Sequence, residues 1–203
     1  MKTEITNYKR LELFNYYNNK DNPFLYVTTR IDITNLYNLG KVNKSCYGTI
    51  GYYITLAMNE IDEFKYRYEN DKIYLYKEIM PSYTQMLKDN TIGFFACPLD
   101  KSYKSFIKEF KRINKDFINN TNAFQNNGQD VVWLSCSPWF TFTGIITPYD
   151  KSISIPQVTW DKFTFEDNKC YINMCIMVHH GFVDGYHIGL FINELNKIIS
   201  NIK

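Results

Sequence analysis

The residues best suited to chemistry lie in one nine-residue segment, HHGFVDGYH, which holds all three histidines of the 203-residue chain. Histidine is the side chain whose ordinary pKa suits proton transfer near neutral pH. Asp184 follows His180 by four positions, so its carboxylate can fold back near the imidazole across one turn, and Gly185 frees the backbone for entry into a helix. The segment therefore predicts a general base, although chance clustering of three histidines is the alternative.

A metal site is the competing interpretation, because two adjacent histidines and an aspartate are possible ligands. Adjacent residues at a strand end point to opposite faces, however, and no third ligand motif accompanies them. The five cysteines are odd in number and lack CxxC spacing, which favours neither a disulfide framework nor a zinc site. We therefore expect no metal.

The elements around this segment must place it at the end of a sheet. The apolar run INMCIMV predicts a strand over Tyr171–Val178 that leads directly into the histidines. After them, one face of a predicted C-terminal helix is apolar, formed by Ile188, Phe191, Ile192, Leu195 and Ile198. We expect His180 to be the base, His179 to be buried on the opposite side of the strand end, and His187 to belong to the helix.

The remaining pattern indicates an α/β protein with two layers. Apolar spacing predicts further helices over 50–61 and 103–117, and the polar stretch Asn119–Asp130 predicts a surface loop. Further strands are predicted at Phe24–Ile31, Lys72–Lys77, Ile92–Cys97, Val131–Cys136, Trp139–Ile146 and Ser152–Thr159. Several strands and packed helices on a chain of this length predict one domain over residues 1–203.

Composition argues against two classes of partner. Hydrophobic residues make up 45% and charged residues 22% of the chain, which is typical of a globular protein. The net charge is only +2 and the basic residues are scattered, so we expect no nucleic-acid partner. No apolar run is long enough to span a bilayer, and the N-terminus lacks the apolar core of a signal peptide. We therefore expect no membrane association and a cytoplasmic protein.

The order of several motifs resembles that of the trimeric, type A chloramphenicol acetyltransferases. The segment HHGFVDGYH looks like the signature of that family, and its H-x-x-x-D-G element is shared with the dihydrolipoamide acyltransferases. Further motifs occur in the family's order: YKRLELFNYY, RIDIT, NEIDEF, PSYT, SCSPW and PQVTWDKF. The resemblance covers essentially the whole chain. It implies the CoA-dependent acyltransferase fold, a two-layer sandwich with a mixed β-sheet and packed helices.

The resemblance implies roles for three catalytic residues. His180 matches the general base that takes a proton from a substrate hydroxyl as this oxygen attacks acetyl-CoA, without an acyl-enzyme. Ser135 in S-x-x-P-W matches the serine that hydrogen-bonds the oxyanion of the tetrahedral intermediate. Thr159 matches a threonine that supports the same intermediate through water. Without the resemblance, Ser135 reads as a small buried polar residue of a strand.

A structural pair is also implied. Asp184 matches a carboxylate that pairs with an arginine of the N-terminal segment, and Arg10 occupies that place. Such a pair would order the loop that holds His180. Taken alone, Asp184 reads as the N-cap of the last helix and Arg10 as a solvated surface charge.

Binding residues follow from the same comparison. Coenzyme A contacts fall at Tyr47, Lys162 and Phe163, where Phe163 replaces a commoner tyrosine, and the acceptor pocket falls at Tyr17 and Trp133. Three features depart from the family's pattern and put the identity of the acceptor in doubt: Phe182, the variable position of Trp133, and a slightly shortened segment between Ser135 and Thr159.

The expected function is the acetyl-CoA-dependent O-acetylation of chloramphenicol, which inactivates the antibiotic. Acetyl-CoA is a co-substrate, and no permanently bound cofactor is expected. The family's active sites lie between the subunits of a homotrimer, and we expect the same here. Two alternatives stay open: an acetyltransferase of the same fold with a different hydroxyl acceptor, and a non-catalytic module that binds the drug or the coenzyme.

Overall fold

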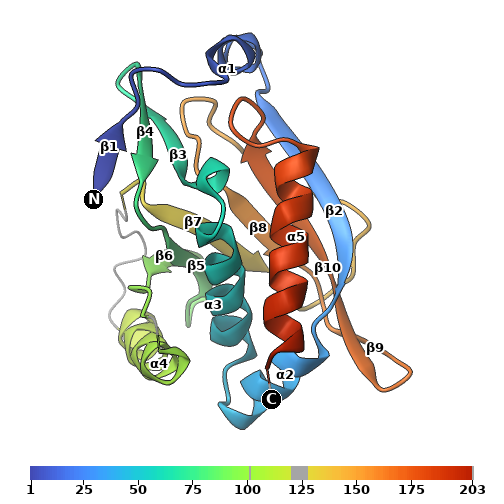
Figure 1. The fold of residues 1–203 in the computed structure, drawn as a ribbon. Helices are drawn as coiled ribbons and strands as arrows, with labels where there is room; N and C mark the ends of the chain where they lie inside the picture. Colours follow the sequence, from blue (N-terminus) through green and yellow to red (C-terminus); the bar gives the residue numbers. More distant parts are fainter. Residues whose placement is uncertain (101, 120–127, 203) are drawn as a thin grey trace.

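The computed structural model of the chain describes residues 1–100, 102–119 and 128–202. A large twisted sheet carries helices on one face, and a smaller sheet lies beside it (Figure 1). The helices are α1 (Leu11–Asn18), α2 (Thr34–Val42), α3 (Cys46–Asn59), α4 (Tyr103–Asn119) and α5 (Gly185–Ser200), with a short 3₁₀ helix, η1, at Asp62–Lys65. Helices α3 and α5 lie side by side over the sheet (Figure 1).

The large sheet is mixed, as the resemblance implies. Within the described residues its strands run in the order β2-β10-β8-β7-β5-β6, and β9 adds to β10. The pairs β7·β8 and β5·β7 are parallel and the others are antiparallel. Its strands are β2 (Phe24–Asp32), β5 (Met80–Met86), β6 (Ile92–Ala96), β7 (Val131–Cys136), β8 (Gln157–Trp160), β9 (Thr164–Glu166) and β10 (Lys169–His179). The predicted two-layer sandwich is confirmed.

Strand β10 is apolar on both faces because both faces are covered. Met174 and Ile176 belong to the core beneath the helices, whereas Cys175 and Met177 point to the opposite face and are also buried. There the Sγ of Cys175 lies 3.3 Å from the carbonyl oxygen of Ile145, in a segment that crosses the sheet. A strand buried on both sides shows a continuous apolar run rather than alternation. This explains why the run INMCIMV correctly predicts a strand.

The smaller sheet, in the order β1-β4-β3, is joined to the large one through a buried guanidinium. Its strands are β1 (Lys2–Glu4), β3 (Tyr66–Glu69) and β4 (Lys72–Tyr76). Arg67 of β3 donates hydrogen bonds to the carbonyl oxygens of Gln129 and Val131 at 2.8 Å each. Burial lowers the pKa of Arg67 to about 9. These bonds fix the start of β7, the strand that carries Ser135.

Two predicted strands were wrong in whole or in part. The segment Trp139–Ile146 forms no strand, and the side chains at its two ends are exposed, Trp139 by 64% and Ile146 by 76%. Its alternation therefore does not reflect pairing within this chain. In Ser152–Thr159 only the part from Gln157 onward is a strand. Pro156 has no N–H to donate to a ladder, and Ser152 is held in a turn by Asp150.

Other elements differ in extent or were missed. The helix predicted at 50–61 begins four residues earlier and ends at Asn59. The C-terminal helix and the helix over 103–117 are confirmed. The missed elements are α1, α2, β1, β3, β5 and β9. The loop predicted at Asn119–Asp130 falls largely on residues 120–127, outside the described part. Among the described residues, none of the helices has both the length and the apolar character needed to cross a membrane.

Helix α3 approaches the sheet closely through a glycine, and this contact can be tested. A Cβ at Gly51 would lie 2.5 Å from the Tyr83 ring and 2.7 Å from Leu134. We expect Gly51→Ala to lower the free energy of unfolding by about 1–3 kcal/mol through overpacking, measured by urea denaturation. Gly189→Ala in α5 is the matched control, because nothing lies within 4 Å of its added Cβ. The control should be neutral or stabilising by about 0.5–1 kcal/mol. Equal effects would contradict the close approach.

Candidate active site

His180 extends β10 by one residue, and its ring has a defined tautomer. Its backbone N–H donates to Pro23 at 2.8 Å, which continues the pairing with β2. Its Nδ1 lies 3.2 Å from the carbonyl oxygen of Val183. A carbonyl oxygen only accepts, so Nδ1 carries the proton and Nε2 keeps its lone pair. Tyr17 stacks on the ring, with centroids 4.0 Å apart and planes inclined by 22°. The exposed part of this imidazole can therefore accept a proton at Nε2.

His179 takes the opposite side of the strand end and is 2% exposed, as predicted. Its Nδ1 accepts the backbone N–H of Gly181 at 3.2 Å. The rings of Phe14 and Phe182 lie 5.3 Å from it, centroid to centroid. Burial, and then the neighbouring charge of His180, lowers the pKa of His179 to about 4. A ring that stays neutral in an aromatic cage supports the turn rather than moving protons.

The turn after the histidines is fixed by an ion pair with the N-terminal segment. Arg10 Nη2 lies 2.9 Å from Asp184 Oδ2, and Arg10 Nη1 donates to the Phe182 carbonyl at 2.7 Å. Asp184 is also the N-cap of α5, accepting the N–H of Tyr186 at 3.0 Å. The two interpretations of Asp184, ion pair and N-cap, therefore hold together. Burial alone would raise the pKa of Asp184, but its electrostatic interactions with His187 and Arg10 and the backbone N–H donors outweigh burial and lower that pKa.

His187 completes the cap, a role that sequence reasoning missed. Its Nδ1 accepts the backbone N–H of Asp184 at 3.2 Å, as a glutamate or glutamine does in the usual capping box. Its Nε2 lies 3.5 Å from Glu63 in η1. The available signal was the spacing of Asp184 and His187, which matches a capping box in which histidine replaces the usual residue.

Ser135 and Thr159 lie side by side on the sheet face that the helices do not cover. They are directly paired in β7 and β8, and Thr159 is paired in turn with Cys175 of β10. The Oγ1 of Thr159 is buried and has no hydrogen-bond partner among the described residues. Because an unpaired buried hydroxyl is costly, this atom needs a water or a ligand group beside it. The row therefore offers two neighbouring hydroxyls to a bound molecule.

The chain does not bring His180 together with this row. His180 lies five residues beyond Cys175 along β10, and Ser135 lies two strands to the side. At the usual rise and strand spacing, their backbones are about 20 Å apart. A reacting atom must lie within about 3 Å of both groups. One copy of the chain therefore cannot hold both against the same substrate.

The expected coenzyme residues lie near the carboxyl end of β8, where the Tyr47 ring packs 5.3 Å from that of Trp160, centroid to centroid. Lys162 is exposed and Phe163 is half-buried, just beyond the carboxyl end of β8. The Tyr47 hydroxyl points inward and lies 2.8 Å from the Thr84 carbonyl and 3.0 Å from that of Leu134. Burial raises the pKa of Tyr47 well above its ordinary value. Because its hydroxyl is occupied within the chain, Tyr47 can contact a ligand only through its half-buried ring.

Asp161 is a further polar residue that sequence reasoning missed. It is fully buried and accepts the backbone N–H and the side-chain amide of Asn173 at 2.7 and 2.8 Å. It also accepts the N–H of Phe142 at 3.2 Å. This carboxylate therefore ties the irregular segment after β7 to β10. Its sequence signal was weak, since an aspartate after a strand usually reads as a turn.

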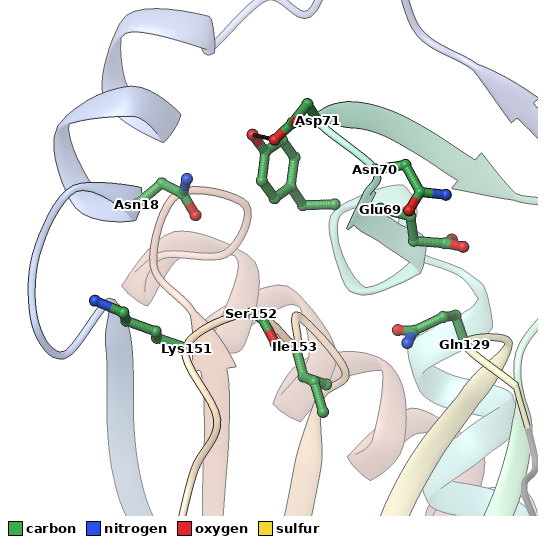
Figure 2. A pocket seen from close by; sticks show the side chains of 9 residues that line it. Asn18, Glu69, Asn70, Asp71, Gln129, Lys151, Ser152 and Ile153 are labelled. Carbon is green, nitrogen blue, oxygen red and sulfur yellow. Dashed lines mark hydrogen bonds between the residues drawn. The ribbon is translucent and has the colours of Figure 1, made fainter.

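A polar hollow of about 550 Å³ lies away from these groups (Figure 2). Its lining residues are Asn18, Tyr68, Glu69, Asn70, Asp71, Gln129, Lys151, Ser152 and Ile153. Asp71 accepts from the Tyr68 hydroxyl and Glu69 is bound to Lys2. Neither Ser135, Thr159 nor His180 lines it, so it is not the place where these groups act. Nor do His, Cys, Asp and Glu gather in threes around a possible metal position anywhere in the described residues.

Comparison with known proteins shows the family of this chain. The family profile described as "Chloramphenicol acetyltransferase" matches residues 1–196. The chain belongs to the chloramphenicol acetyltransferase family. Chloramphenicol acetyltransferases from Clostridium perfringens and Staphylococcus aureus are 29% and 28% identical to it, over 98% and 97% of this chain and 98% and 94% of their own.

Solved structures show the same fold. A chloramphenicol acetyltransferase structure superposes with a TM-score of 0.80 at 22% identity, covering 98% of this chain and all of the other. A probable dihydrolipoamide acetyltransferase from Listeria monocytogenes superposes with a TM-score of 0.67 at 15% identity, over 99% and 95% of the two chains. This member of the chloramphenicol acetyltransferase family therefore has the CoA-dependent acyltransferase fold, and it is an acyltransferase.

The buried histidine of this family member predicts a pH dependence of stability. The folded-state pKa of His179 is about 4 against an ordinary 6.5, so only the unfolded chain takes up this proton as the pH falls between those values. His179 therefore lowers the free energy of unfolding by about 1.4 kcal/mol per pH unit, reaching about 3 kcal/mol at pH 4. His179→Gln should keep the bond from Gly181 and remove this slope. Denaturant unfolding of both proteins from pH 7.5 to 4, at fixed protein concentration, gives the free energy of unfolding against pH. Parallel curves for wild type and His179→Gln would refute the prediction.

Proposed function

We propose that the protein transfers an acetyl group from acetyl-CoA to a hydroxyl of chloramphenicol. The observation that carries the proposal is the fixed tautomer of His180, which leaves a basic Nε2 at the end of a rigid strand. This nitrogen takes the proton of the acceptor hydroxyl while the hydroxyl oxygen attacks the thioester carbonyl. The tetrahedral intermediate then expels the CoA thiolate, which takes up the proton from His180. No acyl-enzyme forms, because the acceptor attacks acetyl-CoA directly.

Ser135 and Thr159 serve the intermediate. The Ser135 hydroxyl donates to the oxyanion, and the orphan Oγ1 of Thr159 holds a water against the same intermediate. Lys162 and Phe163, beyond the carboxyl end of β8, contact the coenzyme, as does the ring edge of Tyr47. Coenzyme A therefore approaches from the carboxyl ends of β7 and β8.

The active site is completed between subunits of a homotrimer. The separation of about 20 Å between His180 and Ser135 supports this arrangement, in which one subunit supplies the base and its neighbour the hydroxyl row. Tyr17, stacked on His180, then lines the acceptor pocket from the same side as the base. The exposed Trp139, Phe140 and Ile146 are suited to burial against a second copy.

Removing the base or the oxyanion donor tests the chemistry. We expect His180→Ala to lower kcat for chloramphenicol acetylation by about 10²–10⁴-fold and Ser135→Ala by about 10²–10³-fold. Release of the CoA thiol, followed by absorbance, measures both. Lys197→Ala, an exposed position far along α5, is the control and should match wild type. Wild-type protein that releases no thiol with chloramphenicol would refute the substrate, and an active His180→Ala variant would refute the mechanism.

Mixing the two inactive variants tests the shared site. When His180→Ala and Ser135→Ala chains are co-expressed, interfaces that pair an intact His180 with an intact Ser135 should form in about a quarter of cases. Activity should therefore return to about a quarter of wild type. Both variants expressed separately and then mixed without subunit exchange are the control. Mixed oligomers that stay inactive would mean that each chain holds its own complete site.

One observation favours a second candidate, transfer to a different hydroxyl acceptor. Trp133 places a large indole on the sheet face two residues before Ser135. A wide indole restricts the shape of the acceptor. Acetyl transfer to other hydroxylated antibiotics or metabolites, with none to chloramphenicol, would favour this alternative.

A further inference from the structure

Trp133 and Gln157 form a second row beside the proposed reaction centre. They are directly paired in β7 and β8, as Ser135 and Thr159 are. Side chains two residues apart on a strand point to the same face, about 6.6 Å apart. Trp133 and Gln157 therefore lie one step from the two hydroxyls on the face that the helices leave uncovered. Both are half-buried, and neither belongs to the main core.

The amide of Gln157 is held from one side. The Thr147 hydroxyl lies 3.0 Å from Gln157 Oε1 and donates to it. A primary amide held by its oxygen presents its two N–H donors at the other end. The free end of Gln157 thus offers donors next to the indole of Trp133.

The coenzyme and the surrounding chain leave the acceptor one direction along this face. Toward the carboxyl ends of β7 and β8, beside the exposed Lys162 and the half-buried Phe163, the proposed function places the coenzyme. Over β10, the segment containing Ile145 lies against Cys175. A molecule with its reacting hydroxyl at Ser135 therefore extends across the row of Trp133 and Gln157.

We propose that Gln157 is a specificity-determining residue that, with Trp133, selects an acceptor carrying a planar ring with a hydrogen-bond-accepting substituent. The indole packs against the ring, and the Gln157 amide N–H donates to the substituent. The nitro group on the phenyl ring of chloramphenicol has this chemistry. The inference rests on the proposed function, because it takes Ser135 as the place of reaction.

Isosteric variants and a matched pair of acceptors test the inference. The acceptors are chloramphenicol and an analogue with hydrogen in place of the nitro group. Gln157→Met keeps the volume and removes the donors, so it should raise the Kd and KM for chloramphenicol by about three- to tenfold and leave those of the analogue unchanged. Gln157→Glu carries only acceptors, so it should weaken chloramphenicol binding more than Gln157→Met does. Thr147→Val should weaken binding less, because it only removes the hydrogen bond that holds the Gln157 amide. The KM for acetyl-CoA should not change.

Binding is measured by calorimetry alongside turnover. A failure of the proposed acetyl transfer can then be distinguished from a failure of the proposed role of Gln157. Gln85→Met is the control, because this β5 glutamine donates to the Met86 carbonyl on the surface and should behave as wild type. Wild type that binds chloramphenicol without acetylating it would overturn the proposed function, while the ratio of Kd values still tests Gln157. Equal losses with both acceptors, no loss with Gln157→Met, or no binding of chloramphenicol by wild type would overturn the role of Gln157.

Discussion

The pairing of β10 with an antiparallel neighbour on each side is the constraint on which the rest of the structure depends. Along one edge β10 pairs with β2 from Tyr171 to His179, and along the other it pairs with β8 from Met174 to Met177. Pairing with β2 holds β10 in place along its length up to His179, the residue before His180. Pairing with β8 places Thr159, and through it Ser135, at the level of Cys175. A slip of one residue would move every side chain to the other face, and it would displace His180 relative to the row of Ser135 and Thr159.

The same register keeps His180 apart from the hydroxyl row of Ser135 and Thr159. His180 stands at the end of β10 and the hydroxyl row at its middle, so the proposed acyl transfer depends on two copies of the chain rather than one. The turn at the strand end must then hold its shape on its own. Arg10, Asp184 and His187 hold it from outside with charge and capping bonds, and His179 holds it from inside as a neutral ring. A rigid base lowers the cost of assembling the site, because little side-chain freedom remains to be lost.

Much of the site was predictable because it depends on short-range pattern. The apolar run before the histidines, the glycine after Asp184 and the amphipathic helix that follows are local signals, and they place His179, His180 and His187 correctly. Trp139–Ile146 misled for the opposite reason, since its alternation has no pairing strand in this chain. Asp161 was missed because its partner, Asn173, is brought to it by tertiary packing. The capping role of His187 was missed because histidine is an uncommon residue at that position of a capping box.

The sequence by itself determined the residue types that can do chemistry, the strand and helix that flank them, and the family. These are set by periodicity and by motif order, which do not require knowledge of the partner strands. Only the tertiary structure decided the tautomer of His180 and the two neighbouring rows formed by Ser135 with Thr159 and by Trp133 with Gln157. Each of these depends on which strands are neighbours and in which register, and hydrogen bonding between distant segments fixes that choice.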